Sequence, residues 1–122
     1  MKIILLLTVV GAALSQAIDY YTIADNNLDM EAVVNDPEKL KAMTDCFLDR
    51  GDCDPVALSI KFIVAESIAR ACDRCTDIQK HLGRVYVSGL FWKRPLDYRN
   101  FARLYDPEGN YLENFMKAVA DY

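Results

Sequence analysis

Two cysteines three positions apart, in the stretch "ACDRCTDIQK", are the residues whose types and spacing could do chemistry in this chain. Cys72 and Cys75 form a C-x-x-C pair. Such a pair serves as a redox dithiol, as half of a zinc site, or as a disulfide that only holds the fold. These uses predict an enzyme, a metal-binding module and a structural protein, in that order.

The N-terminal segment indicates the compartment, which sets the expected state of every thiol. Lys2 precedes an apolar run at 3–14, and "SQA" at 15–17 has the small-x-small pattern of a cleavage site. This arrangement is typical of a secretory signal peptide and is too short for a membrane span. We therefore expect residues 1–17 to be cleaved, residues 18–122 to form one domain, and the protein to be secreted and extracellular.

The cysteines follow the spacing C-x6-C-x18-C-x2-C, at Cys46, Cys53, Cys72 and Cys75. An even number of cysteines in a secreted chain favours disulfides, and four cysteines allow three pairings. A structural zinc site would need two to four residues within each pair, which the six-residue gap does not match. A thioredoxin-like dithiol would follow a strand in a βαβ unit, and no such pattern precedes Cys72. We interpret the cysteines as structural, with their pairing open.

The other polar residues form no catalytic or metal-binding pattern, so we expect no enzyme activity, no metal and no cofactor. His81 is the only histidine and stands beside Lys80 in a polar turn, which indicates a surface residue. After signal cleavage, thirteen basic side chains stand against eighteen acidic ones. This acidic balance argues against nucleic-acid binding and against electrostatic docking to anionic lipid, and we expect no stable membrane insertion.

The segments after residue 27 are predicted to be helices, because apolar residues recur at helical spacing between start and stop signals. Asp36 and Asp54, each followed by proline, are expected N-caps, and Thr76 with Gln79 forms a T-x-x-Q capping box. The expected helical segments are 28–36, 36–51, 54–72, 76–91, 95–107 and 108–122, after an extended arm at 20–27. The sequence thus predicts a compact all-α domain of about six helices.

The segment 54–72 is apolar over most of its circumference. Its polar residues Ser59, Glu66 and Arg70 share one narrow strip. A helix of this kind is expected at the centre of the fold, with neighbours on several sides. The second half of 76–91 is a weaker helix prediction, because it contains Gly89 and several β-branched residues.

Short motifs extend over nearly the whole mature chain. They are the cysteine spacing, "YT" at 21–22 followed by "DNN", "C-x6-C-D-P", "C-x2-C-T-x-x-Q", and "YDPEGNY" at 105–111. In these motifs the chain resembles the insect chemosensory proteins, also called the OS-D or pherokine family. Members are small secreted all-α proteins that enclose an apolar tunnel for long-chain lipophiles. The resemblance implies the same fold, with disulfides between neighbours, Cys46–Cys53 and Cys72–Cys75.

The resemblance also implies a binding site for small lipophilic molecules, such as semiochemicals with fatty-acid-like chains. The residues that match the family's wall positions are Tyr21, Met43, Phe47, Ile60, Val64, Ile68, Tyr86, Leu90, Tyr98, Tyr111 and Phe115. Helical periodicity by itself does not distinguish them from an ordinary core. Lys61 interrupts the apolar surface of its segment, and we interpret it either as a surface lysine with a buried stem or as a polar handle for a ligand carboxylate.

Some positions depart from the family pattern and bear on ligand preference. Asp25 stands where the family often has tyrosine, Met43 replaces a common tyrosine, and Tyr111 replaces a common late tryptophan. The segment 54–72 is also less charged than is usual in the family. These changes fall on wall and mouth positions and leave the predicted fold intact.

The sequence supports two hypotheses about function. The first is a secreted, monomeric carrier that binds lipophiles in a cavity and transports them through extracellular fluid. The second is an extracellular signalling or developmental interaction protein, whose cavity is incidental and whose partner is a receptor or another protein. A membrane-active helical protein fits poorly with the net negative charge.

Overall fold

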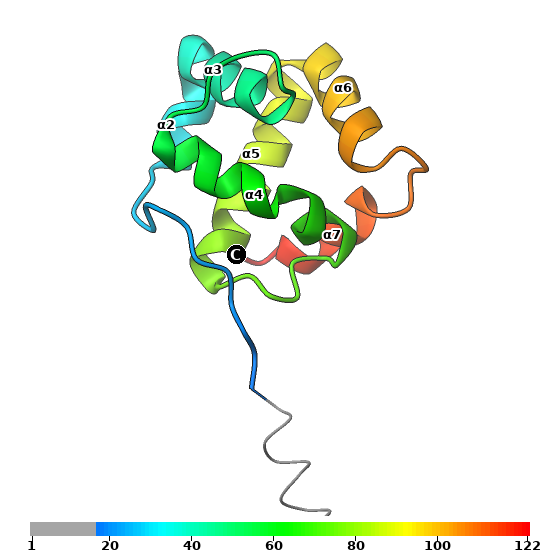
Figure 1. The fold of residues 1–122 in the computed structure, drawn as a ribbon. Helices are drawn as coiled ribbons and strands as arrows, with labels where there is room; N and C mark the ends of the chain where they lie inside the picture. The colour runs from blue at the N-terminus through cyan, green and yellow to red at the C-terminus, as the bar shows by residue number, and fades with distance from the viewer. Residues whose placement is uncertain (1–16) are drawn as a thin grey trace, which may run out of the picture.

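The structure is a computed structural model that describes residues 17–122, so the predicted signal peptide lies outside the described residues except for Ala17. Between residues 17 and 122 the regular elements are six α-helices and no strand. The helices are α2 (Met30–Asn35), α3 (Pro37–Phe47), α4 (Pro55–Ala69), α5 (Asp77–Lys93), α6 (Pro95–Tyr105) and α7 (Leu112–Val119). The all-α prediction is therefore confirmed. In Figure 1, α4 crosses in front of α5, and the shorter helices surround this pair.

The helix starts follow the capping signals in the sequence. Asp36 and Asp54 accept hydrogen bonds from backbone N–H groups in the first turns of α3 and α4, and each precedes a proline at the first helical position. The Thr76 side chain accepts from the N–H of Gln79 at 3.2 Å, and the Gln79 side chain accepts from the N–H of Thr76 at 3.0 Å. These side chains satisfy N–H groups that a helix start leaves without partners, which determines where each helix begins.

The "YDPEGNY" segment joins α6 to α7 through the carboxylate of Asp106. This carboxylate accepts hydrogen bonds from the backbone N–H groups of Asn110 (2.8 Å), Tyr111 (3.1 Å) and Leu112 (3.0 Å). Gly109 has a φ of 73° in the same turn, a conformation that glycine adopts without strain. Burial alone would raise the pKa of Asp106, but the backbone donors outweigh it and the pKa lies below its usual value. The motif therefore caps α7 from outside the helix.

Helix α4 packs against α3, α6 and α7, so segment 54–72 has the expected neighbours on several sides, but it is not buried all round and shares the centre of the fold with α5. Helix α5 packs against α2, α6 and α7, and it buries Tyr86 and Leu90. Helix α4 buries one side, while Phe62 on the other side is 78% exposed and Leu58 is also exposed. A hydropathy pattern counts an apolar side chain alike whether it is packed or exposed, and many apolar side chains stay on protein surfaces.

Gly89 allows α2 and α5 to approach each other closely. A Cβ atom at this position would lie 2.3 Å from Cγ1 of Val34, far inside contact distance. Helix α5 runs unbroken past Gly89 to Lys93. The glycine that weakens the helix prediction from sequence therefore makes room for α2 and does not end the helix.

Both disulfides join neighbouring cysteines, as the family resemblance implies. Cys46–Cys53 closes the loop between α3 and α4, with a Cα–Cα distance of 4.9 Å. Cys72–Cys75 closes the turn between α4 and α5, with a Cα–Cα distance of 5.0 Å, and Ala71 in the same turn has a positive φ of 53°. Each link is local, so neither disulfide ties together helices that are distant in the sequence.

Candidate ligand-binding site

An apolar cavity of about 70 Å³ lies inside the helical domain. Every described helix contributes at least one side chain to its wall, and the N-terminal arm contributes one more. The wall residues are Ile23, Met30, Phe47, Ile60, Ile63, Val64, Ser67, Ile68, Cys72, Cys75, Gln79, Leu82, Gly83, Tyr86, Val87, Phe101 and Phe115. Small-molecule pockets typically measure about 300–1,000 Å³, so a long aliphatic chain needs these helices to move apart.

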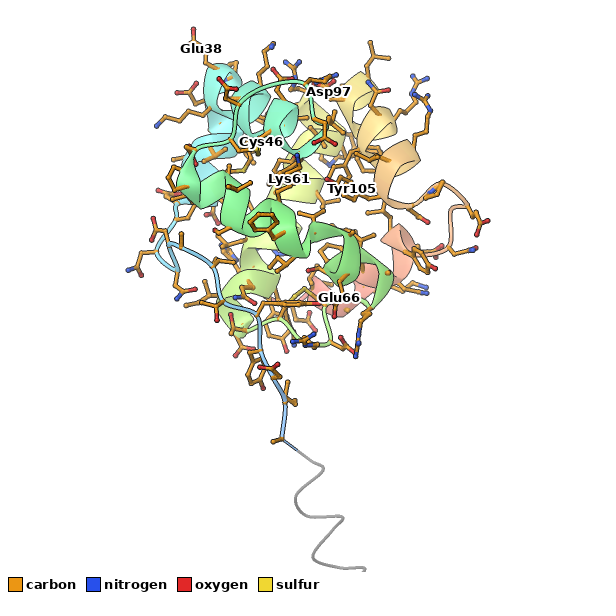
Figure 2. The ribbon with its side chains drawn as sticks, viewed as in Figure 1. Glu38, Cys46, Lys61, Glu66, Asp97 and Tyr105 are labelled. Atoms are coloured by element: carbon orange, nitrogen blue, oxygen red, sulfur yellow. A yellow bond between two sulfur atoms is a disulfide. The ribbon has the colours of Figure 1, made fainter. Side chains whose placement is uncertain are left out.

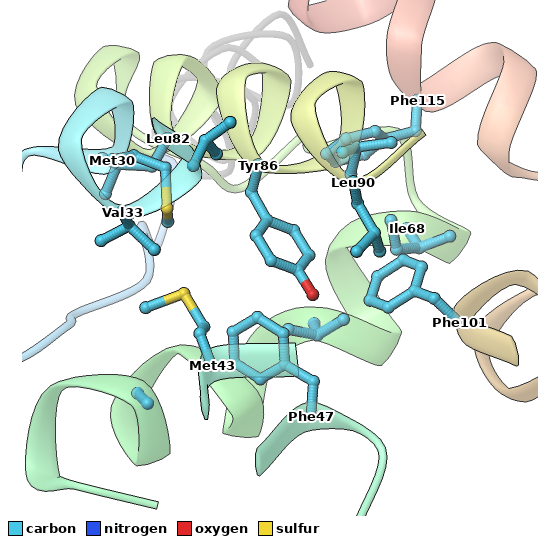
Figure 3. Packing of buried hydrophobic residues seen from close by; sticks show 14 of the residues in the cluster. Met30, Val33, Met43, Phe47, Ile68, Leu82, Tyr86, Leu90, Phe101 and Phe115 are labelled. Atoms are coloured by element: carbon cyan, nitrogen blue, oxygen red, sulfur yellow. The ribbon is translucent and has the colours of Figure 1, made fainter. Parts of the chain in front are cut away.

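Six of the residues that match family wall positions line this cavity. They are Phe47, Ile60, Val64, Ile68, Tyr86 and Phe115. Figure 3 shows four of these, Phe47, Ile68, Tyr86 and Phe115, converging from α3, α4, α5 and α7. Their contact with a ligand stays a prediction.

The other five residues of that set lie away from the cavity wall. Met43 and Leu90 are buried in the core, and Tyr98 is half-buried, with its ring against that of Phe91. Tyr111 is exposed at the start of α7. Tyr21 is half-buried in the N-terminal arm, with the Arg74 guanidinium 4.9 Å from its ring centre. A wall that opens to admit a chain would bring further residues into reach, so the ligand role of these five also stays a prediction.

Sequence reasoning missed eleven wall residues. They are Ile23, Met30, Ile63, Ser67, Cys72, Cys75, Gln79, Leu82, Gly83, Val87 and Phe101. Leu82 lies one helical turn before Tyr86, and this spacing marks it as a core position, which periodicity does not distinguish from a cavity wall. The C-x-x-C pair was interpreted only as a link in the chain, whereas both of its cysteines are also part of the wall.

Tyr86 is the polar centre of the wall. Its hydroxyl lies 2.8 Å from Oγ1 of Thr44 in a buried hydrogen bond. Its ring meets Phe47 edge to face at 5.2 Å between centroids and Phe101 at 5.8 Å. Figure 3 shows the Tyr86 side chain reaching from α5 towards Phe47. Burial raises the pKa of this hydroxyl far above its usual value, so it stays neutral in the physiological range.

The Tyr21 hydroxyl is buried and has no hydrogen-bond partner among residues 17–122. Burial raises its pKa, and the nearby Glu66 carboxylate adds to this shift. Ser67, on the cavity wall, uses its own hydroxyl to donate to the carbonyl of Ile63 at 2.5 Å. Tyr21 is therefore a polar group with an unused hydrogen-bonding capacity in the arm that crosses the helices.

Lys61 forms an ion pair with Asp49, in the turn after α3. Its side chain is 24% exposed, whereas that of Asp49 is 70% exposed. Figure 2 shows Lys61 below the end of α3. The ammonium group is thus occupied by a protein carboxylate and does not line the cavity. Its interpretation as a ligand handle stays a prediction.

Asp97 is a buried carboxylate at the start of α6, labelled in Figure 2. Arg94 Nε lies 2.7 Å from one of its oxygens, and an Arg50 nitrogen lies 3.0 Å from the other. Burial would raise the pKa of Asp97, but the two guanidinium groups outweigh it and the pKa lies below its usual value. This carboxylate is ionised and fully paired, an arrangement suited to holding α6 in place and not to acid–base catalysis.

His81 lies half-exposed on α5, with Nε2 2.7 Å from a Glu31 carboxylate oxygen. Among the described residues, no group of three His, Cys, Asp or Glu side chains is arranged to hold a metal ion. The helices between residues 17 and 122 also include none that is long and apolar enough to cross a membrane.

Comparisons with known proteins agree with this geometry. Residues 20–113 match the model of the family described as "Insect pheromone-binding family, A10/OS-D". The chain is 29% identical over 113 residues to "Allergen Tha p 1" of Thaumetopoea pityocampa, covering 93% of this chain and 90% of the relative. It is 25% identical over 121 residues to "Ejaculatory bulb-specific protein 3" of Drosophila melanogaster, covering 99% and 95% of the two chains.

Two solved structures share the fold. A "Chemosensory Protein in Complex with bromo-dodecanol" superposes with a TM-score of 0.68 at 23% identity, over 80% of this chain and 94% of that one. Antennal chemosensory protein A6 from the moth Mamestra brassicae superposes with a TM-score of 0.66 at 22% identity, over 79% and 89% of the two chains. The family model covers well over half of the present chain, from the N-terminal arm to the first turn of α7. The chain therefore belongs to the insect pheromone-binding A10/OS-D family.

Proposed function

We propose that this protein is a secreted, monomeric carrier that binds long-chain lipophiles in its internal cavity and transports them through extracellular fluid. The observation that carries the proposal is the apolar cavity to which every described helix contributes. A structural neighbour of the same fold is a chemosensory protein in complex with bromo-dodecanol, which supports an aliphatic ligand here as well. Secretion rests on the signal-peptide pattern at residues 1–17.

The energetics of such binding are favourable without any charged contact. Each methylene group that leaves water contributes about 0.8 kcal/mol, so a chain of about 12 carbons gains on the order of 9 kcal/mol before ordering costs. A micromolar dissociation constant corresponds to about 8 kcal/mol. The gain from a chain of about 12 carbons is therefore comparable to that free energy before ordering costs, and longer chains gain more.

Uptake requires the helices to separate, because the cavity is small compared with such a chain. Both disulfides are local, linking α3 to α4 and α4 to α5 through short turns. The packing of α7 and α6 on the cavity is held only by noncovalent contacts of side chains such as Phe101 and Phe115. We propose that these helices shift to admit the aliphatic chain and then close on it.

The wall chemistry favours neutral lipophiles. Among the described residues that line the cavity, none carries a charge, and the polar ones are Ser67, Gln79 and Tyr86. Gln79 and Tyr86 already use their side chains in protein hydrogen bonds. An alcohol, aldehyde or ester is therefore a better ligand class than a carboxylate, whose desolvation the wall does not offset.

Displacement of a fluorescent long-chain probe without a carboxylate tests the proposal. Alcohols of about 12 to 18 carbons are expected to displace the probe with micromolar constants. Val64→Phe and Ile60→Phe place a ring in the cavity wall and are expected to weaken displacement at least about tenfold. Leu58→Phe, on the exposed side of the same helix, is the matched control.

Circular dichroism melting of each variant establishes that it is folded before its binding is compared. If no long-chain alcohol displaces the probe from the folded protein, or if the folded cavity variants bind like Leu58→Phe, the carrier function is wrong.

A further inference from the structure

An exposed apolar and basic patch lies at the corner between α5 and α6. This corner patch consists of Phe91, Trp92, Lys93, Leu96, Arg99 and Arg103. Trp92 is 76% exposed and Leu96 is 69% exposed. The Phe91 ring packs edge to face against the Trp92 ring, with 5.0 Å between the ring centroids. Figure 1 shows α6 at the outer edge of the molecule. All six side chains of the corner patch are exposed.

Helical spacing places the outer residues of α6 on one face. Leu96, Arg99 and Arg103 follow one another at intervals of three and four positions and are all exposed. On the opposite face of α6, Asp97 and Phe101 are buried. Helix α6 therefore buries one face in the core, and its solvent face carries both arginine and leucine side chains. The exposed Trp92 precedes α6 at the end of α5.

The corner patch is positively charged although the chain as a whole has a formal net charge of −4. Residues 91–105 contain four cationic side chains and one carboxylate, Asp97. Asp97 is buried and paired with Arg94 and Arg50, so it does not compensate the exposed cations. Lys93, Arg99 and Arg103 form no ion pair with any described residue. The rest of the chain carries a correspondingly larger negative excess.

We propose that the corner patch docks the protein reversibly on an anionic lipid surface. Tryptophan, phenylalanine and leucine beside lysine and arginine are the side chains that settle at the boundary between headgroups and acyl chains. Each basic side chain near such a surface is attracted by its negative potential. The three cations without an ion pair and the exposed Trp92 and Leu96 supply both kinds of contact. The Phe91 ring packs against Trp92 and against Tyr98 of α6, which joins the two helices at this corner.

The shape of the patch favours a lipid surface over an acidic protein. The central residues of a protein interface fill fitted, desolvated pockets on the partner surface. In the corner patch Trp92 and Leu96 are exposed, whereas Lys93 borders a groove that Asn35 and Leu40 also line. A fluid bilayer adapts to such a surface without any matched pocket.

This docking goes beyond binding in the cavity and gives the carrier a place to release its ligand. The exposed corner is the end of α5, the helix whose Leu82, Tyr86 and Val87 line the cavity. An aliphatic ligand that leaves the cavity at a bilayer passes directly into hydrocarbon and avoids water. The net negative charge of the whole chain does not exclude this docking. In 0.1 M salt a charged membrane acts mainly on charges within one Debye length of it, about 10 Å.

Trp92 is the only tryptophan in the chain, so its fluorescence reports on the patch directly. The full mature protein is titrated with vesicles of phosphatidylcholine alone and with vesicles that also contain phosphatidylserine. We expect a blue shift of Trp92 emission and cosedimentation with the anionic vesicles only. Both are expected to weaken at least tenfold when salt rises from about 0.05 M to about 0.5 M.

The double variant Arg99→Glu/Arg103→Glu is expected to weaken vesicle binding at least about tenfold. Lys39→Glu/Lys117→Glu makes the same change in net charge at exposed positions of α3 and α7 and is expected to bind within about twofold of the original protein. Probe displacement from the cavity is measured for both variants, so that a loss of docking is distinguished from a loss of fold or of ligand binding.

The proposal is overturned if Trp92 emission is unchanged by anionic vesicles, or if the two double variants bind them equally. It is also overturned if soluble polyglutamate binds the patch while vesicles do not, because an acidic protein is then the partner. Elution of the protein as a dimer that buries Trp92 would overturn it as well, because the patch would then be an interface between copies.

Discussion

Two buried tyrosine hydroxyls differ in whether they have a hydrogen-bond partner. The Tyr86 hydroxyl bonds to Thr44 at 2.8 Å, whereas the Tyr21 hydroxyl has none among the described residues. Tyr86→Phe leaves the buried Thr44 hydroxyl unpaired and is expected to lower the free energy of unfolding by about 1–2 kcal/mol. Tyr21→Phe is expected to leave the free energy of unfolding unchanged or to raise it. Urea unfolding followed by circular dichroism measures both, and a larger loss for Tyr21→Phe would contradict this assignment.

The ion pairs of Asp97 give a pH dependence with a definite sign. Its folded-state pKa lies below the usual value of about 3.9, so its stabilisation is fully present above that pH and is lost as pH falls through the folded pKa. Asp97→Asn is expected to lower the free energy of unfolding by about 1–3 kcal/mol at pH 7. The difference from the original protein should shrink as pH falls from about 5 to about 2. Urea titrations across this range, with the exposed Asp121→Asn as control, check the trend, and a deficit that grows in acid would contradict it.

At the scale of helices, the contact between α2 and α5 depends on the absence of a side chain at Gly89. Gly89→Ala places a Cβ atom against Val34, and the clash is expected to cost about 1–3 kcal/mol despite the better helix propensity of alanine. Val34→Ala in the same chain provides room, so the double variant should be more stable than the two separate losses predict. Thermal unfolding of the four proteins measures this coupling, and strictly additive losses would contradict the close contact.

The elements themselves were largely predictable from the sequence, because their boundaries depend on local chemistry. Asp36, Asp54 and the pair Thr76 and Gln79 cap the helices that they were expected to start. The exposed side of α4 was not predictable, because Phe62 has the same hydropathy whether it is buried or exposed. The disulfide pairing came from the family resemblance, since spacing alone leaves three pairings open.

The candidate site was predictable only in part. Phe47, Tyr86 and Phe115 stood at matching family positions and do line the cavity. Gly83 also lines the cavity. The Phe115 ring packs so close to Gly83 that a Cβ placed there would lie 2.9 Å from the ring. Such a contact depends on how two helices cross, and no pattern within one segment contains that information. The same holds for Asp97, whose partner Arg50 lies in the loop after α3.

For the whole molecule, local disulfides and a shared cavity form the container that we propose opens between its helices to admit a ligand. The disulfides hold two turns, and the apolar wall is assembled from all six described helices. The C-x-x-C pair has two structural roles. Its disulfide closes the turn between α4 and α5, and both cysteines form part of the cavity wall. The proposed roles divide over the surface and the interior, with ligand in the cavity and lipid at the corner patch.

The most direct test of ligand binding in the cavity is a crystal structure of the protein grown with a bromine-labelled long-chain alcohol. Anomalous scattering locates the bromine without any assumption about the ligand's path. We predict that the alcohol chain lies among Phe47, Tyr86 and Phe115, with these rings displaced outward around it. An alcohol found only on the outer face of α4 beside Phe62, with the inner rings in their present positions, would contradict a carrier that binds its ligand inside.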